Sequence, residues 1–357
     1  MRPRRSAVAI VVALAALAGC AGSGAHVNRG GAIERFLRGY VQPDGRVVRH
    51  DQGGDTVSEG QSYALLLTAA TGRAAQFARV WGWTRSHLQR PDGLLAWRWA
   101  GGHVVGHQPA TDADLDAARA LLVAAKRFRR PAYRAAALRI GRAVLASETT
   151  RVGGTLVLVA GPWARAHAIV NPSYFAPRTL ALLGAASGDP RWGDLIRSGL
   201  AIAGSLQGHA SGLGPDWARA VPGGAVAIGL PADPSAQARY GYDALRMPLR
   251  LAEACSGPAR AQAAAPWRTL RGAAGSGRVA PVYDLGGTPL AQGEHPAALA
   301  GAAAAAAAAG DRASAQRLLV AALRLSERHP SYYGAAWAAL GSVMLRSQRL
   351  LGCPLAR

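Results

Sequence analysis

The sequence predicts an all-α protein whose helices pair into six hairpins closed around one axis, with long loops forming a cleft. Three observations support this fold class. From Gly31 onward, apolar residues recur at spacings of three and four, which is the periodicity of amphipathic helices. Turn-forming residues separate these segments. Several connections are long, irregular and contain Asp, Trp, Tyr and Gly, as expected where a barrel-like scaffold places its binding groove.

The periodicity predicts twelve helices, with boundaries good to about three residues. They span 31–41, 60–71, 74–88, 113–128, 131–147, 173–187, 190–206, 240–254, 259–272, 293–309, 311–327 and 331–348. Capping residues mark several of their ends. The expected start signals are Ser58, Asp189-Pro190 and Asp311, and the expected terminating glycines are Gly72, Gly188 and Gly310.

Paired helices also build open α-solenoids, but common solenoid repeats have a fixed period, and this sequence has none. The long connections favour the closed arrangement instead. These connections lie at 42–58, 89–112, 148–172, 207–239 and 273–292. Alternating Thr, Val and Leu in residues 151–159 predict a short strand beside the cleft. Because no linker divides the chain after about residue 30, residues 31–350 are expected to form one domain.

The N-terminal segment resembles a bacterial lipoprotein signal. An Arg-rich start and an apolar stretch too short to span a membrane precede Leu17-Ala18-Gly19-Cys20. Residues 1–19 are therefore predicted to be a removed signal peptide, with Cys20 lipidated and residues 20–30 serving as a flexible tether. This predicts an exported protein, anchored in the membrane and facing the periplasm or cell exterior. An ordinary signal peptide that happens to contain Cys20 is the alternative.

The chain is strongly basic, with 41 Lys and Arg against 20 Asp and Glu and a net charge of +21. Removal of residues 1–19 takes away three arginines and leaves +18. The remaining arginines are scattered and no nucleic-acid-binding motif surrounds them, so no nucleic-acid partner is expected. An anionic envelope surface is the more plausible contact.

Two cysteines, Cys255 and Cys353, remain once Cys20 is assigned to lipid. An oxidising compartment permits a disulfide between them. Two separate buried thiols are the alternative.

Acidic residues are scarce, so the alternation Asp112, Asp114 and Asp116 at a predicted helix start is notable. Negative charge is favoured there by the helix dipole, and Asp112 is also a candidate N-cap. A calcium loop is discounted because the required glycine and the final glutamate are absent. No metal or organic cofactor is expected.

Two further acids are candidate proton-transfer groups. Glu59 begins an apolar helix and is followed by Tyr63 and by tryptophans at 81, 83, 97 and 99. Aromatic surroundings would raise the pKa of its carboxyl and suit it to donate a proton, whereas an ordinary first-turn glutamate is the alternative. Asp243 lies between two tyrosines and two arginines, where an Asp/Arg ion pair is the alternative. Nine Trp and nine Tyr against four Phe suit stacking on sugar rings, although protein interfaces favour the same residues.

Several motifs in order make the sequence resemble glycoside hydrolase family 8 over residues 31–345. Residues Ser58–Tyr63, with Trp81–Thr84 and Gly93–Trp99, resemble the family's acid-bearing region. Residues Ala110–Phe128 resemble the family signature, and Tyr242–Arg246 resemble its base-bearing segment. Two further motifs, Asn171–Tyr174 and Pro215–Trp217, lie between these in the expected order. Ala117 departs from the signature, which usually has a bulky aliphatic residue there.

The resemblance implies an (α/α)6 barrel and an inverting hydrolase. It implies that Glu59 is the general acid, that Asp243 is the general base, and that Asp112 grips the sugar at the cleavage point. Tyr174, Trp97 and Arg246 would bind substrate.

Because residue 243 is an aspartate, the sequence resembles the branch of the family that contains bacterial cellulases, including endoglucanases of cellulose-secretion systems. This implies a β-1,4-glucan substrate and a possible link to secretion machinery. Xylan or chitosan as substrate, or a non-catalytic glycan-binding scaffold, are the alternatives.

Overall fold

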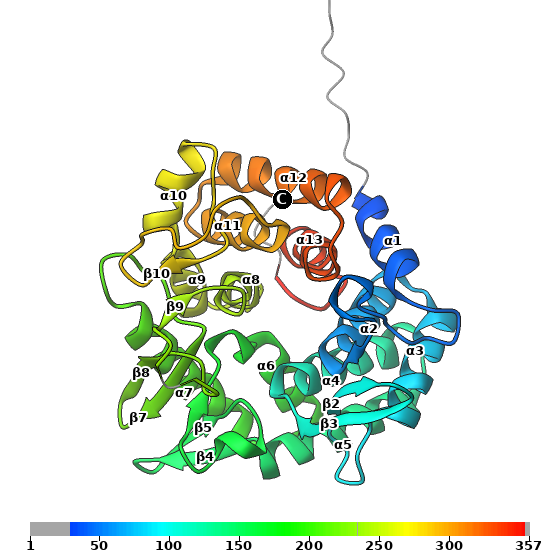
Figure 1. Cartoon of the computed structure of the whole chain (residues 1–357). Helices are drawn as coiled ribbons and strands as arrows, with labels where there is room; N and C mark the ends of the chain where they lie inside the picture. The colour runs from blue at the N-terminus through cyan, green and yellow to red at the C-terminus, as the bar shows by residue number, and fades with distance from the viewer. Residues whose placement is uncertain (1–28, 234, 354–357) are drawn as a thin grey trace, which may run out of the picture.

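The computed structural model describes residues 29–233 and 235–353, and this part of the chain contains thirteen α-helices. Six of them form a closed inner ring in which each helix contacts the next (Figure 1). In ring order these are α2 (Ser58–Thr71), α4 (Thr111–Arg127), α6 (Pro177–Ser187), α8 (Met247–Ala252), α11 (Pro296–Ala308) and α13 (Tyr332–Arg346).

The other helices occupy six outer positions. These are α1 (Arg29–Tyr40), α3 (Ala74–His87), α5 (Pro131–Ser147), α7 (Arg191–Gln207), the pair α9 (Gly257–Ala264) and α10 (Trp267–Gly275), and α12 (Arg312–Arg328). Outer and inner helices alternate along the chain. The predicted all-α barrel is therefore confirmed, with twelve positions occupied by thirteen helices.

The extra helix arises because the predicted helix at 259–272 is two helices, broken before Pro266. Proline lacks the N–H that a continuous helix needs and its ring crowds the preceding turn. The prediction of a helix at 240–254 was also too long. Asp216 accepts hydrogen bonds from the N–H groups of Gly241 and Ala244 and holds a turn there, so the chain enters a short 3-10 helix, η4 (Ala244–Arg246), before α8.

Some of the other predicted helix starts and ends are confirmed by the structure, and others are shifted. Asp311 caps α12 by accepting the N–H of Ser314, as predicted, and left-handed Gly72 and Gly188 end their helices. Ser58, predicted as a cap or first-turn signal, is the first residue of α2 with Glu59 in the first turn, and the N-cap residue is Val57. Helix α6 begins at Pro177, not 173, since a residue before proline disfavours helix. Helix α1 begins at Arg29, inside the predicted tether; Cys20 and the predicted signal peptide lie outside the described residues.

In the part of the chain that the structure describes, four small antiparallel sheets lie within the long connections. They consist of β1 (Thr56–Val57), β2 (Ala96–Ala100) and β3 (His103–Pro109); β4 (Thr149–Val152) and β5 (Thr155–Leu158); β6 (Ile169–Val170), β7 (Trp217–Val221) and β8 (Gly224–Ile228); and β9 (Arg239–Tyr240) and β10 (Tyr283–Asp284). The strand predicted at 151–159 is the hairpin β4–β5, and the other sheets were not predicted. Among the described helices, none is long and apolar enough to span a membrane.

Three buried ion pairs link α4 to the segment around α8 through the interior of the ring. Arg246 binds Asp112, Arg250 binds Asp116, and Arg119 binds Glu253. Successive partners are three or four residues apart on both segments, which places them on one face of each. These three ion pairs, here called the ion-pair ladder, therefore connect Arg246 with the end of the barrel that contains the chain's C-terminal segment.

A disulfide between Cys255 and Cys353 closes this end of the ion-pair ladder. The Cys353 N–H donates to the carbonyl of Glu253, and Arg119 donates to the carbonyl of Leu350. Of the two alternatives left open by the sequence, the structure has the bridged one.

Replacing both cysteines with serine is expected to destabilise the protein substantially. The bridge spans 98 residues, and closing a loop of about 100 residues contributes roughly 4 to 5 kcal/mol by restricting the unfolded chain. Urea unfolding of Cys255→Ser/Cys353→Ser should show a midpoint well below that of the oxidised wild type. Reduced wild type is the matched control and should resemble the double variant; an unchanged midpoint in both would refute this role.

Candidate active site

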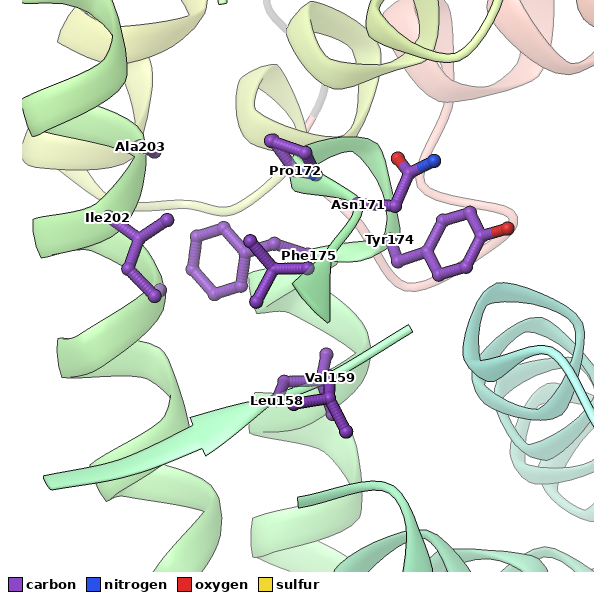
Figure 2. A pocket seen from close by; sticks show the side chains of 10 residues that line it. Leu158, Val159, Asn171, Pro172, Tyr174, Phe175, Ile202 and Ala203 are labelled. Carbon is purple, nitrogen blue, oxygen red and sulfur yellow. The ribbon is translucent and has the colours of Figure 1, made fainter. Parts of the chain in front are cut away.

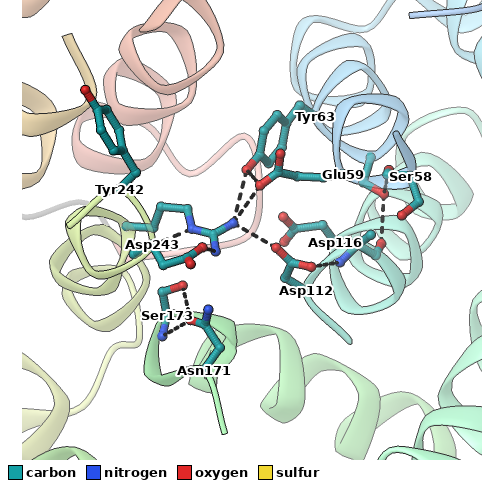
Figure 3. Close-up of polar contacts among 12 residues, drawn as sticks. Ser58, Glu59, Tyr63, Asp112, Asp116, Asn171, Ser173, Tyr242 and Asp243 are labelled. Atoms are coloured by element: carbon teal, nitrogen blue, oxygen red, sulfur yellow. Dashed lines mark hydrogen bonds and ion pairs between the residues drawn. The ribbon is translucent and has the colours of Figure 1, made fainter. Parts of the chain in front are cut away.

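The buried guanidinium of Arg246 bonds three carboxylates. Figure 3 shows these carboxylates, which belong to Glu59, Asp112 and Asp243, pointing toward one another. Its Nη1 donates to Glu59 Oε1 and to Asp112 Oδ2, both at 2.7 Å. Its Nη2 donates to Asp243 Oδ1 at 2.5 Å. Three acids that are far apart in the sequence thus share one cation. The arginine side chain is only 1% exposed, so it lies beneath the carboxylates and has little surface to offer a ligand.

Glu59 lies in the first turn of α2, where the helix dipole favours a negative charge. Its Oε1 accepts a second hydrogen bond from the Tyr63 hydroxyl at 2.7 Å, one helical turn along. Burial raises the pKa of the Glu59 carboxyl, and the Asp112 charge adds to this, while the Arg246 cation opposes it. The side chain remains 24% exposed, so Glu59 can exchange a proton with a ligand.

Of the aromatic residues expected around Glu59, Tyr63 is bonded to it, as predicted. Tyr63 is itself held by the indole N–H of Trp337 on α13, at 3.0 Å. Trp83 and Trp99 instead pack against each other away from these contacts. Helix α13 lies beside α2 in the ring, and this proximity of the chain's two ends is not visible in the local sequence.

Asp112 occupies the first turn of α4, and its Oδ1 accepts the N–H of Ala113. The N-cap of α4 is Ala110, so the N-cap alternative for Asp112 was wrong. Burial raises the pKa of Asp112, against the lowering effect of Arg246 and Arg250. In the described residues, no group of three or more His, Cys, Asp or Glu side chains is arranged to hold a metal ion.

Asp243 precedes η4 and is 32% exposed. Burial is the main cause that raises the pKa of its carboxyl to about 6, and the charges of Asp216 and Glu59 act in the same direction. The terminal nitrogens of one guanidinium are held in a rigid plane, so the bonded oxygens of Glu59 and Asp243 lie within about 8 Å of each other. This upper limit is compatible with the separation of about 6.5–9.5 Å in inverting carboxyl pairs and also with the separation of about 5–5.5 Å in retaining pairs.

A tight turn, η3 (Pro172–Tyr174), forms the side of the site opposite Glu59. Asn171 caps it by accepting the N–H of Ser173, and the Tyr174 ring lies over the Arg246 guanidinium at 5.3 Å. Figure 2 shows Tyr174 and Phe175 on opposite sides of this turn, with Phe175 facing α7. Phe175 packs on Gly199, where a Cβ would come within 2.2 Å of the ring, so the close approach requires glycine there. A cavity of only about 20 Å³ remains behind the turn.

An open cleft of about 460 Å³ leads to Glu59 and Asp243. Its walls also carry Arg49, Gln52, Tyr242, His295, Ser331 and Tyr333. Sequence reasoning missed the contributions of His295 and Tyr333. Both lie at the N-terminal ends of inner helices, α11 and α13, where inner-helix starts converge around the axis. Their positions at the predicted starts of inner helices could have indicated that they face the cleft.

Trp97, predicted to bind substrate, lies on β2 outside this group of contacts. Its ring covers Gly106 of the paired strand β3 and is 41% exposed. The structure thus brings together Glu59, Asp112, Asp243, Arg246 and Tyr174, and places Trp97 on the neighbouring hairpin.

A ring of paired helices with carboxyl groups in a cleft at one end of its axis defines an α/α-barrel protein with an acidic site. The chain belongs to the glycosyl hydrolases family 8, whose family model matches residues 1–344.

The relatives found by comparison support this membership. A probable endoglucanase of Novacetimonas hansenii is 36% identical over 224 residues, covering 60% of this chain and 64% of that protein. An endoglucanase of Cellulomonas uda is 30% identical over 225 residues, covering 61% and 62%. The matches therefore cover less than two thirds of these relatives' own length. The solved endo-β-1,4-glucanase of Acetobacter xylinum superposes with a TM-score of 0.75 at 30% identity, covering 88% of this chain and 96% of that one.

Proposed function

We propose that the protein is an inverting endo-β-1,4-glucanase. The observation that carries this is the Arg246 cluster: three carboxylates on one guanidinium, two of them accessible from an open cleft. The names of the similar proteins, endoglucanase and endo-β-1,4-glucanase, support the choice of substrate.

In each of the two carboxyl groups, one oxygen is hydrogen-bonded within the protein and the other is available to a ligand. Arg246 and Tyr63 occupy Glu59 Oε1, and Arg246 occupies Asp243 Oδ1. The second oxygens, Glu59 Oε2 and Asp243 Oδ2, are then the ones available to a ligand. Glu59 donates its proton through Oε2 to the glycosidic oxygen as the bond to the anomeric carbon breaks. Water attacks that carbon from the opposite face, and Asp243 Oδ2 accepts the proton that the water loses.

The remaining residues hold the sugar and the acids. Asp112 would bind the sugar hydroxyls at the cleavage point, and the Tyr174 ring would contact its face. Trp97 would stack on a more distant sugar of the chain. Arg246 keeps the three carboxylates at fixed mutual positions and limits the rise in their pKa values.

The pH dependence should follow from the two raised pKa values. A general base must be ionised, so kcat/KM is expected to fall as the pH drops below about 6, the value of the Asp243 pKa. A general acid must be protonated, and the raised pKa of Glu59 extends activity toward neutral pH. A pH profile of kcat/KM on a soluble glucan checks this; an acidic limb near pH 4 would contradict the assigned environment of Asp243.

We also propose that the protein is exported, is lipid-anchored through Cys20 and acts beside cellulose-secretion machinery. The disulfide between Cys255 and Cys353 supports an oxidising compartment. Incorporation of labelled palmitate into the wild type but not into Cys20→Ser would support the anchor, and equal labelling would contradict it.

Reducing-end release from carboxymethyl-cellulose, xylan and chitosan tests the proposed activity. The glucanase assignment predicts that carboxymethyl-cellulose is the preferred polymer and that Asp243→Asn, prepared in parallel, releases none. Preference for xylan or chitosan would move the substrate to that polymer. Inactivity on every polymer would favour a glycan-binding scaffold.

A further inference from the structure

Two carboxyl groups outside the Arg246 cluster are fully buried side by side. Asp114 lies in the first turn of α4 and Glu148 is the C-cap residue of α5. Asp114 Oδ1 accepts the N–H of Leu95 at 2.8 Å. Asp114 Oδ2 and both Glu148 oxygens receive no hydrogen bond from any donor of the described residues. Asp114 and Glu148, here called the buried acid pair, lie within hydrogen-bonding reach of each other.

Two carboxylates cannot both remain ionised at such a position, because burial and mutual repulsion each disfavour the second charge. Burial raises the pKa of both groups well above the usual range. The Thr111 hydroxyl also lies within hydrogen-bonding reach of Glu148 and lowers the pKa of that carboxyl, but its one proton is donated to the carbonyl of Val159 at 2.7 Å. A proton carried by the pair itself is therefore what supplies the missing donor.

The two helix ends decide which residue carries the proton. Asp114 is at the N-terminal end of α4, where the helix dipole stabilises a negative charge, and it also accepts a backbone N–H. Glu148 is at the C-terminal end of α5, where the dipole disfavours a negative charge. The neutral carboxylic acid thus belongs to Glu148 and the charge to Asp114.

The neighbouring carboxylates oppose this assignment in part, because the charges of Asp112 on α4 and of Asp92 in the loop before β2 raise the pKa of Asp114. Two effects reduce this opposition: Asp92 is paired with Arg90, and Asp112 raises the pKa of Glu148 as well. Arg139 on α5 and Arg165 after η2 (Pro162–Ala164) donate to backbone carbonyls near the pair. Among the described residues, none of these cations bonds either carboxyl group of the pair.

We propose that Glu148 is a protonated acid that donates to ionised Asp114, and that this bond positions Asp112, two residues away, for the reaction. The bond fixes the first turn of α4 to the end of α5, while Asp114 holds the segment leading into β2. Asp114 and Glu148 are positioning residues, because neither touches the cleft.

Glu148→Gln and Glu148→Leu form a matched pair for testing this. Glutamine keeps a neutral donor toward Asp114, whereas leucine removes it at similar size. Glu148→Leu is expected to reduce kcat at least about tenfold more than Glu148→Gln, through displacement of Asp112. Equal kcat values for the two folded variants would overturn the positioning role.

The protonation itself is tested without substrate. An acid with a raised pKa stabilises the fold below its ordinary pKa, about 4.3, and loses that contribution as pH rises toward the raised value. The melting temperature of Glu148→Gln should therefore gain on that of the wild type as pH increases from 5 to 9. The infrared C=O band of a protonated carboxyl should be present in the wild type at pH 7 and weaker in Glu148→Gln. Parallel melting curves and an unchanged band would overturn the shared proton.

The kcat comparison rests on the proposed glucanase function, whereas the melting and infrared measurements do not. Inactivity of the wild type on every polymer would refute the function alone, and the shared proton would still be decided by the other two measurements.

Discussion

Glu59→Gln is expected to lower kcat on carboxymethyl-cellulose by roughly 10²- to 10⁴-fold, the usual contribution of a general acid. Glutamine has the same shape, and its oxygen can accept the bonds that Tyr63 and Arg246 now make to Oε1. The fold should therefore survive, with a melting temperature close to that of the wild type. The group facing the cleft would become an amide, which cannot protonate the leaving oxygen.

A substrate whose leaving group needs no proton tests most directly whether Glu59 is the general acid. On a dinitrophenyl β-cellooligosaccharide, Glu59→Gln should recover much of its lost rate. Asp243→Asn should remain inactive on both substrates, because the attacking water still lacks a base. An equal loss for Glu59→Gln on both substrates would contradict its role as the acid.

Arg246→Met should be the most disruptive single substitution in the site. Among the described residues, Arg246 is the only side chain that bonds all three carboxylates, and removing one partner of a buried ion pair destabilises by about 3 to 5 kcal/mol. The carboxyl groups would then take up protons or move apart, so kcat should also fall by at least about a hundredfold. Urea unfolding and steady-state kinetics measure the two effects.

Two companion variants distinguish charge from geometry. Arg191→Met removes an exposed arginine paired with Asp189, and is expected to change stability by less than about 1 kcal/mol. Arg246→Lys keeps the charge but lacks the fork that reaches carboxylates on both sides. It should recover part of the stability and little of the activity; full activity would show that charge alone suffices.

The sequence predicted the helices of the barrel well because their apolar periodicity is a local property. It failed where a distant residue determines the backbone. The turn before Arg246 depends on Asp216, which accepts two N–H groups from 25 and 28 residues further along. The sheets β1–β2–β3 and β6–β7–β8 likewise join segments whose strand pattern is too short to stand out.

The acids of the site could be chosen from the sequence because carboxylates are scarce and lie in recognisable motifs. The position of Arg246 could not, since it follows from a register between α4 and the segment around α8 that only the packed barrel defines. An arginine predicted to bind substrate lies instead beneath the acids. The protonated partner of Asp114 was equally hidden, because nothing near Glu148 in the sequence indicates that it faces another carboxyl group.

The most direct test of the central claim, that Glu59 and Asp243 act as an inverting pair around Arg246, is the anomeric form of the first product. Proton NMR of a cellooligosaccharide during early hydrolysis resolves the α and β forms of the new reducing end before they equilibrate. Water attacking with Asp243 as base predicts that the α-anomer appears first. Initial release of the β-anomer would mean that Asp243 attacks the sugar directly, and would contradict the account.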